Sequence, residues 1–272
     1  MNPLLVPTYD RDSVVTDLKD AWHNFVMVAE SIDDSKFTAM TSCPSWNVHD
    51  VVAHIIGIEK MLLGEATPEA DIDGFEHIRN SIGAINERWI VHLRSLDAVD
   101  IVTALSETLL RREHAIEKMD EQDFEKVGWS PIGDVSYSRF MSIRVFDIWI
   151  HEQDIREAVG QNGGLDTKAA HRAYLEATTN MGYVVAKKAA LDNGAVVGFH
   201  IIDAPSFSVA VADGRGVLAD PQQDESCSLE MSMSTYMRLI AGRGEPKFND
   251  DVAFAGDLDQ ASRVLSNLAF TI

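Results

Sequence analysis

The sequence has few cysteines, few basic residues and no long apolar run. Its 272 residues include two cysteines, Cys43 and Cys227, which excludes the disulfide framework of small secreted domains. The 23 lysine and arginine residues stand against 43 aspartate and glutamate residues, giving a formal net charge of -20. Such a charge repels nucleic-acid phosphates and anionic lipid headgroups, so we expect neither nucleic acid nor a membrane as a partner.

The sequence also lacks the segments that would direct it to or across a membrane. Its most apolar stretch, GAVVGFHIIDAPSFSVAVA, is interrupted by Asp203 and Pro205. A bilayer-spanning helix needs about 20 predominantly apolar residues. The first ten residues, MNPLLVPTYD, have neither the basic flank nor the apolar core of a secretory signal. We therefore expect a cytoplasmic protein.

Several common catalytic motifs are missing. The chain has no phosphate-binding G-x-x-x-x-G-K-[ST], no strand-borne G-x-G-x-x-G and no G-x-S-x-G, which excludes the chemistry built on these loops. The run HEQDI begins like the metallopeptidase motif H-E-x-x-H, but Ile155 stands where the second histidine is required. Cys43 precedes Pro44 in a predicted loop and has no neighbour that would lower its pKa, so we interpret it as a small loop residue.

Apolar spacing predicts that residues 1–160 form a helical bundle. A first helix is indicated by a stripe with spacings of three and four residues: Val14, Leu18, Trp22, Phe25 and Ala29. A second helix is predicted in SWNVHDVVAHIIGIEKMLLG, with Asn47 as its cap, Asp50 at its third position and Gly64 at its end. Further helices are expected near 73–93 and 99–119, and the loop GWSPIGDVSY should lead into a helix that contains residues 144–160.

The glycine-dense segment GQNGGLDT is typical of a linker and predicts a second domain over residues 167–272. A helix over 168–191 should precede strands at AVVGFHIID and SFSVAVADGRGVLAD, where Asp213 and Gly214 supply a hairpin turn. Helices are then expected at MSTYMRLIAGR and LDQASRVLSNLA. The fold class is therefore mainly α, with a smaller C-terminal α+β domain.

The stretch RVFDIWIHEQDIREAVG carries an unusual polar stripe. At about 100° per residue, one sector of this helix, bordered by isoleucines, contains Arg144, Asp147, His151 and Asp154. Residues on the opposite half are expected to face solvent: Glu152, Gln153, Arg156 and Glu157. The alternative is a solvated salt-bridge ladder, because polar pairs four residues apart are common on helices.

His54 is the best partner for this stripe. It lies beside apolar residues of its own helix, whereas His49, Glu59 and Lys60 are predicted on the other side. Alone, His54 would more often be a hydrogen-bonded core histidine. Together with Asp147 and His151 it would supply two imidazoles and one carboxylate, which suits a Zn²⁺ site with an open position, and equally non-haem Fe²⁺ or Ni²⁺.

Three segments carry a resemblance to a known family: CPSWNVHDVVAHIIGIEKMLLG, DIWIHEQDIR and YMRLIAGR. They resemble the mycothiol-dependent maleylpyruvate isomerase family of DinB-like metal-binding proteins. The resemblance implies a DinB-like four-helix bundle, a sterol-carrier-like C-terminal domain and a divalent metal, usually zinc, held by His54, Asp147 and His151. The characterised isomerases carry glutamate where this chain has Asp147.

The resemblance also implies an activity. We expect a metal-dependent enzyme that uses a low-molecular-weight thiol, mycothiol, for isomerisation or S-transfer on a small electrophilic substrate. Arg243 is the candidate for binding a substrate carboxylate, with Arg238 as second choice, although a surface role for Arg243 is equally compatible with the sequence. The alternatives are a non-catalytic, metal-stabilised binding protein and an apolar-ligand site in the second domain. A homodimer is an open possibility.

Overall fold

The computed structural model describes residues 6–220 and 223–271 and divides into two compact units. One unit comprises Thr8–Ala170, and the other comprises the residues from His171 onward together with Val6 and Pro7. Within the described ranges, none of the helices combines the length and the apolar character needed to cross a membrane.

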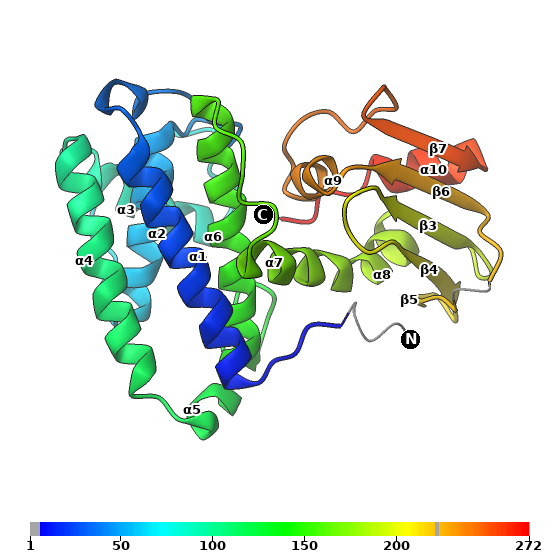
Figure 1. The fold of residues 1–272 in the computed structure, drawn as a ribbon, viewed down its shortest axis with the longest axis horizontal. Helices are drawn as coiled ribbons and strands as arrows, with labels where there is room; N and C mark the ends of the chain where they lie inside the picture. Colours follow the sequence, from blue (N-terminus) through cyan, green and yellow to red (C-terminus); the bar gives the residue numbers. More distant parts are fainter. Residues whose placement is uncertain (1–5, 221–222, 272) are drawn as a thin grey trace. The chain divides into compact units, whose positions relative to one another are not determined.

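Four long helices form the bundle of the first unit (Figure 1). They are α1 (Arg11–Ser31), α2 (Val48–Leu62), α4 (Ala98–Glu117) and α6 (Tyr137–Val159). Each packs against two of the others, in the cyclic order α1, α6, α2, α4, and α3 (Ser81–Leu93) packs against α2. The shorter elements of this unit are η2 (Asp34–Lys36), α5 (Glu121–Glu125), β1 (Val127–Gly128) and β2 (Val135–Ser136).

The ends of α2 are set by local hydrogen bonds. Asn47 and Asp50 form a reciprocal capping box at its start, as predicted. Gly64 lies just beyond its end with φ +85°, a left-handed conformation that terminates helices. The direction of α2 is thereby fixed at the end that precedes His54.

The buried residues of the bundle confirm the predicted apolar stripe on α1 but differ from the prediction for α6. All five predicted α1 residues are buried. Helix α6 is buried on nearly every side, including Trp149 and Glu152, so the expectation that Glu152 faces solvent was wrong. The GQNGGLDT segment folds back over this side of α6, where Trp149 Nε1 donates to the carbonyl of Gly164 at 2.8 Å. Glu152 accepts from Arg156 Nε at 2.7 Å.

Two boundaries in the bundle differ from the sequence prediction. Helix α3 begins at Ser81, capped by Asn80, rather than near Asp73. The residues 73–80 form turns instead. The predicted loop GWSPIGDVSY contains the short hairpin β1/β2, with Gly128 opposite Val135. These pairings involve only two residues on each side, which is too short to leave an alternating pattern.

The second unit contains a five-stranded sheet in the order β5-β4-β3-β6-β7, in which only β3 and β6 run parallel among the paired strands. Its strands are β3 (Val196–Ile201), β4 (Phe207–Ala212), β5 (Arg215–Leu218), β6 (Cys227–Met231) and β7 (Val252–Gly256). Asp213 and Gly214 both have positive φ in the β4–β5 turn, as the predicted hairpin requires.

Helical segments cover one face of this sheet, where α8 and α10 lie on the same side (Figure 1). The elements are α7 (Lys168–Thr179), which spans the division between the units, α8 (Met181–Tyr183), the π-helical η3 (Val184–Lys188), α9 (Met233–Ile240) and α10 (Leu258–Leu265). The helix expected over 168–191 is therefore broken. At Gly182 an added Cβ would lie 2.4 Å from the Gly216 carbonyl oxygen, so two backbones touch there. The predicted fold class, mainly α with a smaller α+β part, is confirmed.

We predict that Gly57→Ala destabilises the bundle. A Cβ at Gly57 would lie 2.5 Å from the Cβ of Trp89, so α2 and α3 would have to separate. The free energy of unfolding in urea should fall by roughly 1–3 kcal/mol. Gly83→Ala is the matched control, because its nearest neighbour would be 3.6 Å away. That substitution should be neutral or stabilise by about 0.5–1 kcal/mol, and equal destabilisation by both would contradict the packing argument.

Candidate metal centre

Three side chains from two helices converge in the core of the bundle. His54 comes from α2, and Asp147 and His151 come from α6; one ligand atom of each lies within 4.8 Å of the other two. His54 Nε2 is 3.4 Å from Asp147 Oδ2, and His151 Nε2 is 3.8 Å from Asp147 Oδ1. Both distances exceed the 2.7–3.2 Å of an ordinary N–H···O hydrogen bond. The contact of His54 with Asp147 is a long hydrogen bond and that of His151 with Asp147 is longer still, so the three groups leave room for a cation between them.

The three candidate ligands differ in their exposure to solvent. The side chain of Asp147 is 33% exposed. The imidazoles of His54 and His151 are only 4% and 6% exposed. The two imidazole rings meet edge to face at 4.7 Å, and the indole of Trp46 lies 5.1 Å from the first and 5.9 Å from the second. An incoming small molecule would therefore approach past the carboxylate.

Both histidines have surroundings that suit metal ligation. Nδ1 of His151 lies 3.1 Å from Asp154 Oδ2, and a carboxylate that accepts the Nδ1 proton leaves Nε2 as the ligand nitrogen. Burial lowers the pKa of His54 to about 4, against the opposing influence of Asp147, so this ring is neutral at pH 7. Within the described residues, the buried Nδ1 of His54 has no hydrogen-bond partner.

A buried ionic chain lies behind Asp147. The Arg144 guanidinium donates from Nη1 to Asp147 and from Nη2 to Glu59 Oε1, the latter at 2.8 Å. The other oxygen of Glu59 accepts from Arg112 Nε at 2.8 Å. Glu59 is fully buried, which its predicted place on the side of α2 away from His54 did not indicate. Its two arginine partners are 53 and 85 residues away in the sequence, and no local pattern could indicate them.

The charges in this chain keep both carboxylates ionised. Burial alone would raise the pKa of Glu59, but the charges of Arg144 and Arg112 outweigh it and lower that pKa. Burial acts in the same direction on Asp147, yet Arg144 and the neighbouring histidines hold its pKa well below the ordinary value. Because Arg144 occupies Oδ2 of Asp147, Oδ1 is the oxygen directed toward His151.

Trp46 is anchored from α3. Its Nε1 donates to Glu87 Oε2 at 3.1 Å, and Glu87 also bonds His77 and Arg94. Arg94 in turn donates to Asp50, a member of the α2 capping box, at 2.9 Å. The indole of Trp46, which lies beside both imidazoles, is therefore held by hydrogen bonds that are linked through Arg94 to the capping box of α2.

The structure adds a residue that the sequence interpretation missed. The Cys43 sulfur lies within 4.8 Å of a ligand atom of His151 and of Asp154. The sequence alone indicates only a small loop residue at Cys43. The one available signal is its position three residues before Trp46, whose ring lies tilted beside both imidazoles.

The proposed anion-binding residues belong to the other compact unit. Arg243 follows α9 and is half-buried, and its Nη1 donates to the carbonyl of Ala241 at 2.6 Å. Arg238 lies in the last turn of α9. Neither residue belongs to the helical unit that contains the three candidate ligands.

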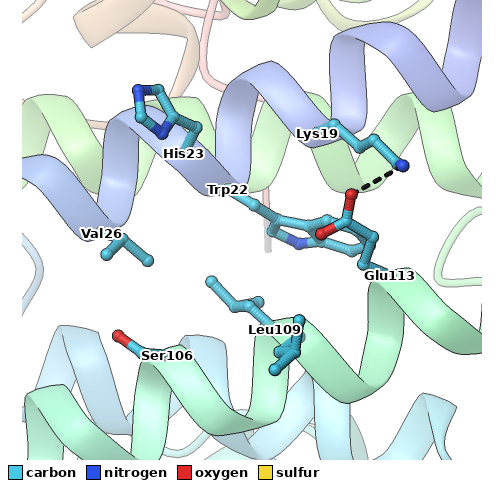
Figure 2. Close-up of a pocket in the computed structure, with 8 residues that line it drawn as sticks. Lys19, Trp22, His23, Val26, Ser106, Leu109 and Glu113 are labelled. Atoms are coloured by element: carbon cyan, nitrogen blue, oxygen red, sulfur yellow. Dashed lines mark ion pairs between the residues drawn. The ribbon is translucent and has the colours of Figure 1, made fainter.

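A separate groove of about 420 Å³ lies between α1 and α4. Figure 2 shows Trp22 and Leu109 along it, with an ion pair between Lys19 and Glu113 at one end. Ser106 donates its hydroxyl proton to Val102 of its own helix at 3.1 Å, so it is not presented to the groove as a nucleophile. This groove contains none of the candidate ligands, and the chemistry of the bundle is concentrated around His54 and His151.

The fold and the convergent ligand atoms define the class of protein: a helical bundle with a candidate divalent-cation site in its core, followed in the chain by an α+β unit. The chain belongs to the mycothiol maleylpyruvate isomerase family, because the family's N-terminal domain model matches residues 18–156. The predicted resemblance is thereby confirmed. No curated protein sequence matches the chain.

Solved structures give the same fold over most of the chain. A crystal structure of the mycothiol-dependent maleylpyruvate isomerase is similar at 16% identity and a TM-score of 0.61, covering 93% of this chain and 98% of that one. A mutant of the mycothiol-dependent maleylpyruvate isomerase, with one histidine replaced by alanine, is similar at 15% identity and a TM-score of 0.58, with the same coverage. At these identities the likeness establishes the fold.

We predict that the metal-free protein loses stability as the pH falls from 6.5 to about 4. In this window the unfolded chain binds a proton at His54, whose ordinary pKa is 6.5, while the folded chain does not until its pKa of about 4 is reached. The free energy of unfolding should drop by about 3 kcal/mol from this group. His54→Gln should remove that part of the slope, and the exposed His114→Gln should retain it. Parallel slopes for wild type and His54→Gln would contradict the burial of a neutral ring.

Proposed function

We propose that this chain is a thiol-dependent isomerase or S-transferase whose His54, Asp147 and His151 hold one divalent cation. The observation that carries the proposal is the convergence of two imidazoles and a carboxylate, with His54 and His151 at 3.4 and 3.8 Å from Asp147. Two nitrogens and one oxygen leave a tetrahedral cation with an open position. Zinc suits this set best, and nickel and ferrous iron are the alternatives.

The cation, when bound, would lower the pKa of a thiol in the open position and so supply a thiolate at neutral pH. The residues around it perform the remaining tasks. Asp154 keeps the proton of His151 on Nδ1, so that Nε2 stays available as a ligand. Arg144 holds Asp147 ionised and oriented. Trp46 covers the two imidazoles and keeps water from that side.

The family name supports mycothiol as the thiol, and a small electrophile as its partner. In an isomerase, the sulfur would add to an activated double bond, the resulting single bond would rotate, and elimination of the sulfur would restore the double bond. In a transferase, the sulfur would displace a leaving group or open an epoxide and remain on the product.

Arg243 remains a proposal for binding an anionic electrophile. The support is its place in the family-like AGR segment and the affinity of a guanidinium for carboxylates. If it acts in this way, its removal should weaken substrate binding and leave the thiol site unchanged.

One observation favours a second candidate function, a metal-stabilised binding protein without turnover. Arg144 already neutralises Asp147, so the cluster is balanced in charge even before a cation arrives. Such a protein would gain stability from the cation and would not bind a thiol at the open position. Thiol binding therefore separates the two functions.

We predict that the purified protein holds one divalent cation per chain and that His151→Ala loses it on dialysis against a mild chelator. Elemental analysis measures the occupancy, and stripping the wild type should also lower its thermal midpoint, because the cation binds only the folded chain. His114→Ala, an exposed histidine in the last turn of α4, is the matched control and should keep full occupancy. Full occupancy in both variants would place the cation elsewhere.

We also predict that mycothiol binding to the cation-loaded Cys43→Ser protein releases a proton, since the bound form is the thiolate. The substitution removes the chain's own half-buried thiol, which could otherwise take up that proton. The calorimetric heat should then change with the ionisation enthalpy of the buffer, and Asp147→Ala and His54→Ala should abolish both binding and turnover. Arg243→Ala should raise the apparent KM for an anionic electrophile by roughly tenfold or more, with thiol binding unchanged. A heat of binding that is the same in all buffers would argue against a thiolate.

A further inference from the structure

A second set of ligand atoms lies beside the first and shares one residue with it. Cys43, His151 and Asp154 each place one sulfur, nitrogen or oxygen atom within 4.8 Å of the other two. Asp154 is buried, and Cys43 is half-buried. A thiolate, an imidazole and a carboxylate are the ligand types that zinc and cobalt accept in proteins.

The loop that carries Cys43 is held firmly against α6. The carbonyl of Cys43 accepts from the amide of Trp46 at 3.1 Å, and its own amide donates to Thr41 Oγ1 at 3.1 Å. Thr41 closes the turn by donating its amide to the Trp46 carbonyl at 3.0 Å. The neighbouring Ser42 donates to Glu157 on α6 at 2.7 Å. A hydrogen-bonded turn therefore holds the Cys43 sulfur near His151.

His151 makes the two sets alternatives. Its Nε2 faces Asp147 Oδ1 at 3.8 Å, and its Nδ1 faces Asp154 Oδ2 at 3.1 Å. A neutral imidazole has one lone pair and one N–H, so it can ligate a cation from only one nitrogen at a time. A cation on the Nδ1 side would require the proton to move to Nε2, where Asp147 can accept it.

We propose that Cys43, His151 and Asp154 form a second cation position, in which the chain's own thiolate is a ligand, and that one cation exchanges between it and the position at His54 and Asp147. On binding there, the thiol proton of Cys43 is released to solvent as the sulfur–cation bond forms. The inference rests on the proposed function in one respect, since both require a divalent cation at His151.

This arrangement assigns a role to the internal thiol. Without an external thiol, the cation rests at Cys43, where a soft ligand completes its coordination. An external thiol that binds at the His54 position supplies the sulfur ligand in place of Cys43 and draws the cation there. The chain would thereby keep its cation while it waits for the cosubstrate, and Cys43 would compete with every thiol that enters.

The test uses the cobalt-loaded full chain with no thiol added. Thiolate ligation produces a sulfur-to-cobalt charge-transfer absorption, which imidazole and carboxylate ligands do not. We expect this absorption in the wild type, and a stronger one per bound cobalt in His54→Ala, where only the Cys43 position remains complete. Cys43→Ser should lose it and still bind cobalt through His54. Cys227→Ser is the matched control and should keep it, because Cys227 is buried in β6.

A second readout keeps the test decisive if Cys43→Ser does not fold. In the wild type, cobalt should slow alkylation of Cys43 by iodoacetamide, measured by peptide mass, and added mycothiol should restore the rate. Cobalt-bound wild type and His54→Ala that both lack the charge-transfer absorption would overturn this inference and leave the proposed function standing. A Cys43-dependent absorption in a protein that binds no external thiol would sustain the inference and remove the proposed function.

Discussion

The carboxylate of Glu59, buried between two guanidiniums, is the constraint on which the bundle and its site depend. It joins α2 to α4 through Arg112 and to α6 through Arg144, with contacts of 2.8 Å on both sides. Buried charges are costly unless they are paired, and removing one partner would leave an uncompensated charge in the core. Since Arg144 also donates to Asp147, this ionic chain fixes the rotation of α6 about its axis, and with it the face that presents His151.

Two polar clusters of different character thus lie side by side in one core. Around Glu59 every charge has a close partner of opposite sign, which specifies a single packing of three helices. Around His54 the contacts are long, and a buried ring nitrogen has no partner among the described residues. Native cores keep such unsatisfied groups where they serve binding or catalysis. The fully paired cluster around Glu59 supports the fold, and the incompletely paired cluster around His54 is the candidate site.

His151 belongs to both sets of candidate ligands. One ring nitrogen faces the exposed side at Asp147, and the other faces Asp154 and the loop of Cys43. The exposed side can admit a small molecule, because a third of the Asp147 side chain is open to solvent. On the other side, Cys43 is half-buried in a hydrogen-bonded turn. A single imidazole therefore lies between the Asp147 carboxylate and the Cys43 thiol.

The sequence by itself determined the elements and the family, because helix stripes, the Asn47 capping box and the Asp213–Gly214 turn act over a few residues. It also indicated that His54, Asp147 and His151 belong together, since residues four apart share a helix face and the family segments contain all three. Only the tertiary structure decided where Glu59 and Glu152 lie. The burial of Glu59 depends on Arg112 and Arg144, which are far away in the chain, and that of Glu152 depends on a loop that folds back over α6. The same holds for Cys43: a loop residue acquires its chemistry from whatever the fold brings opposite it, and no local pattern encodes that.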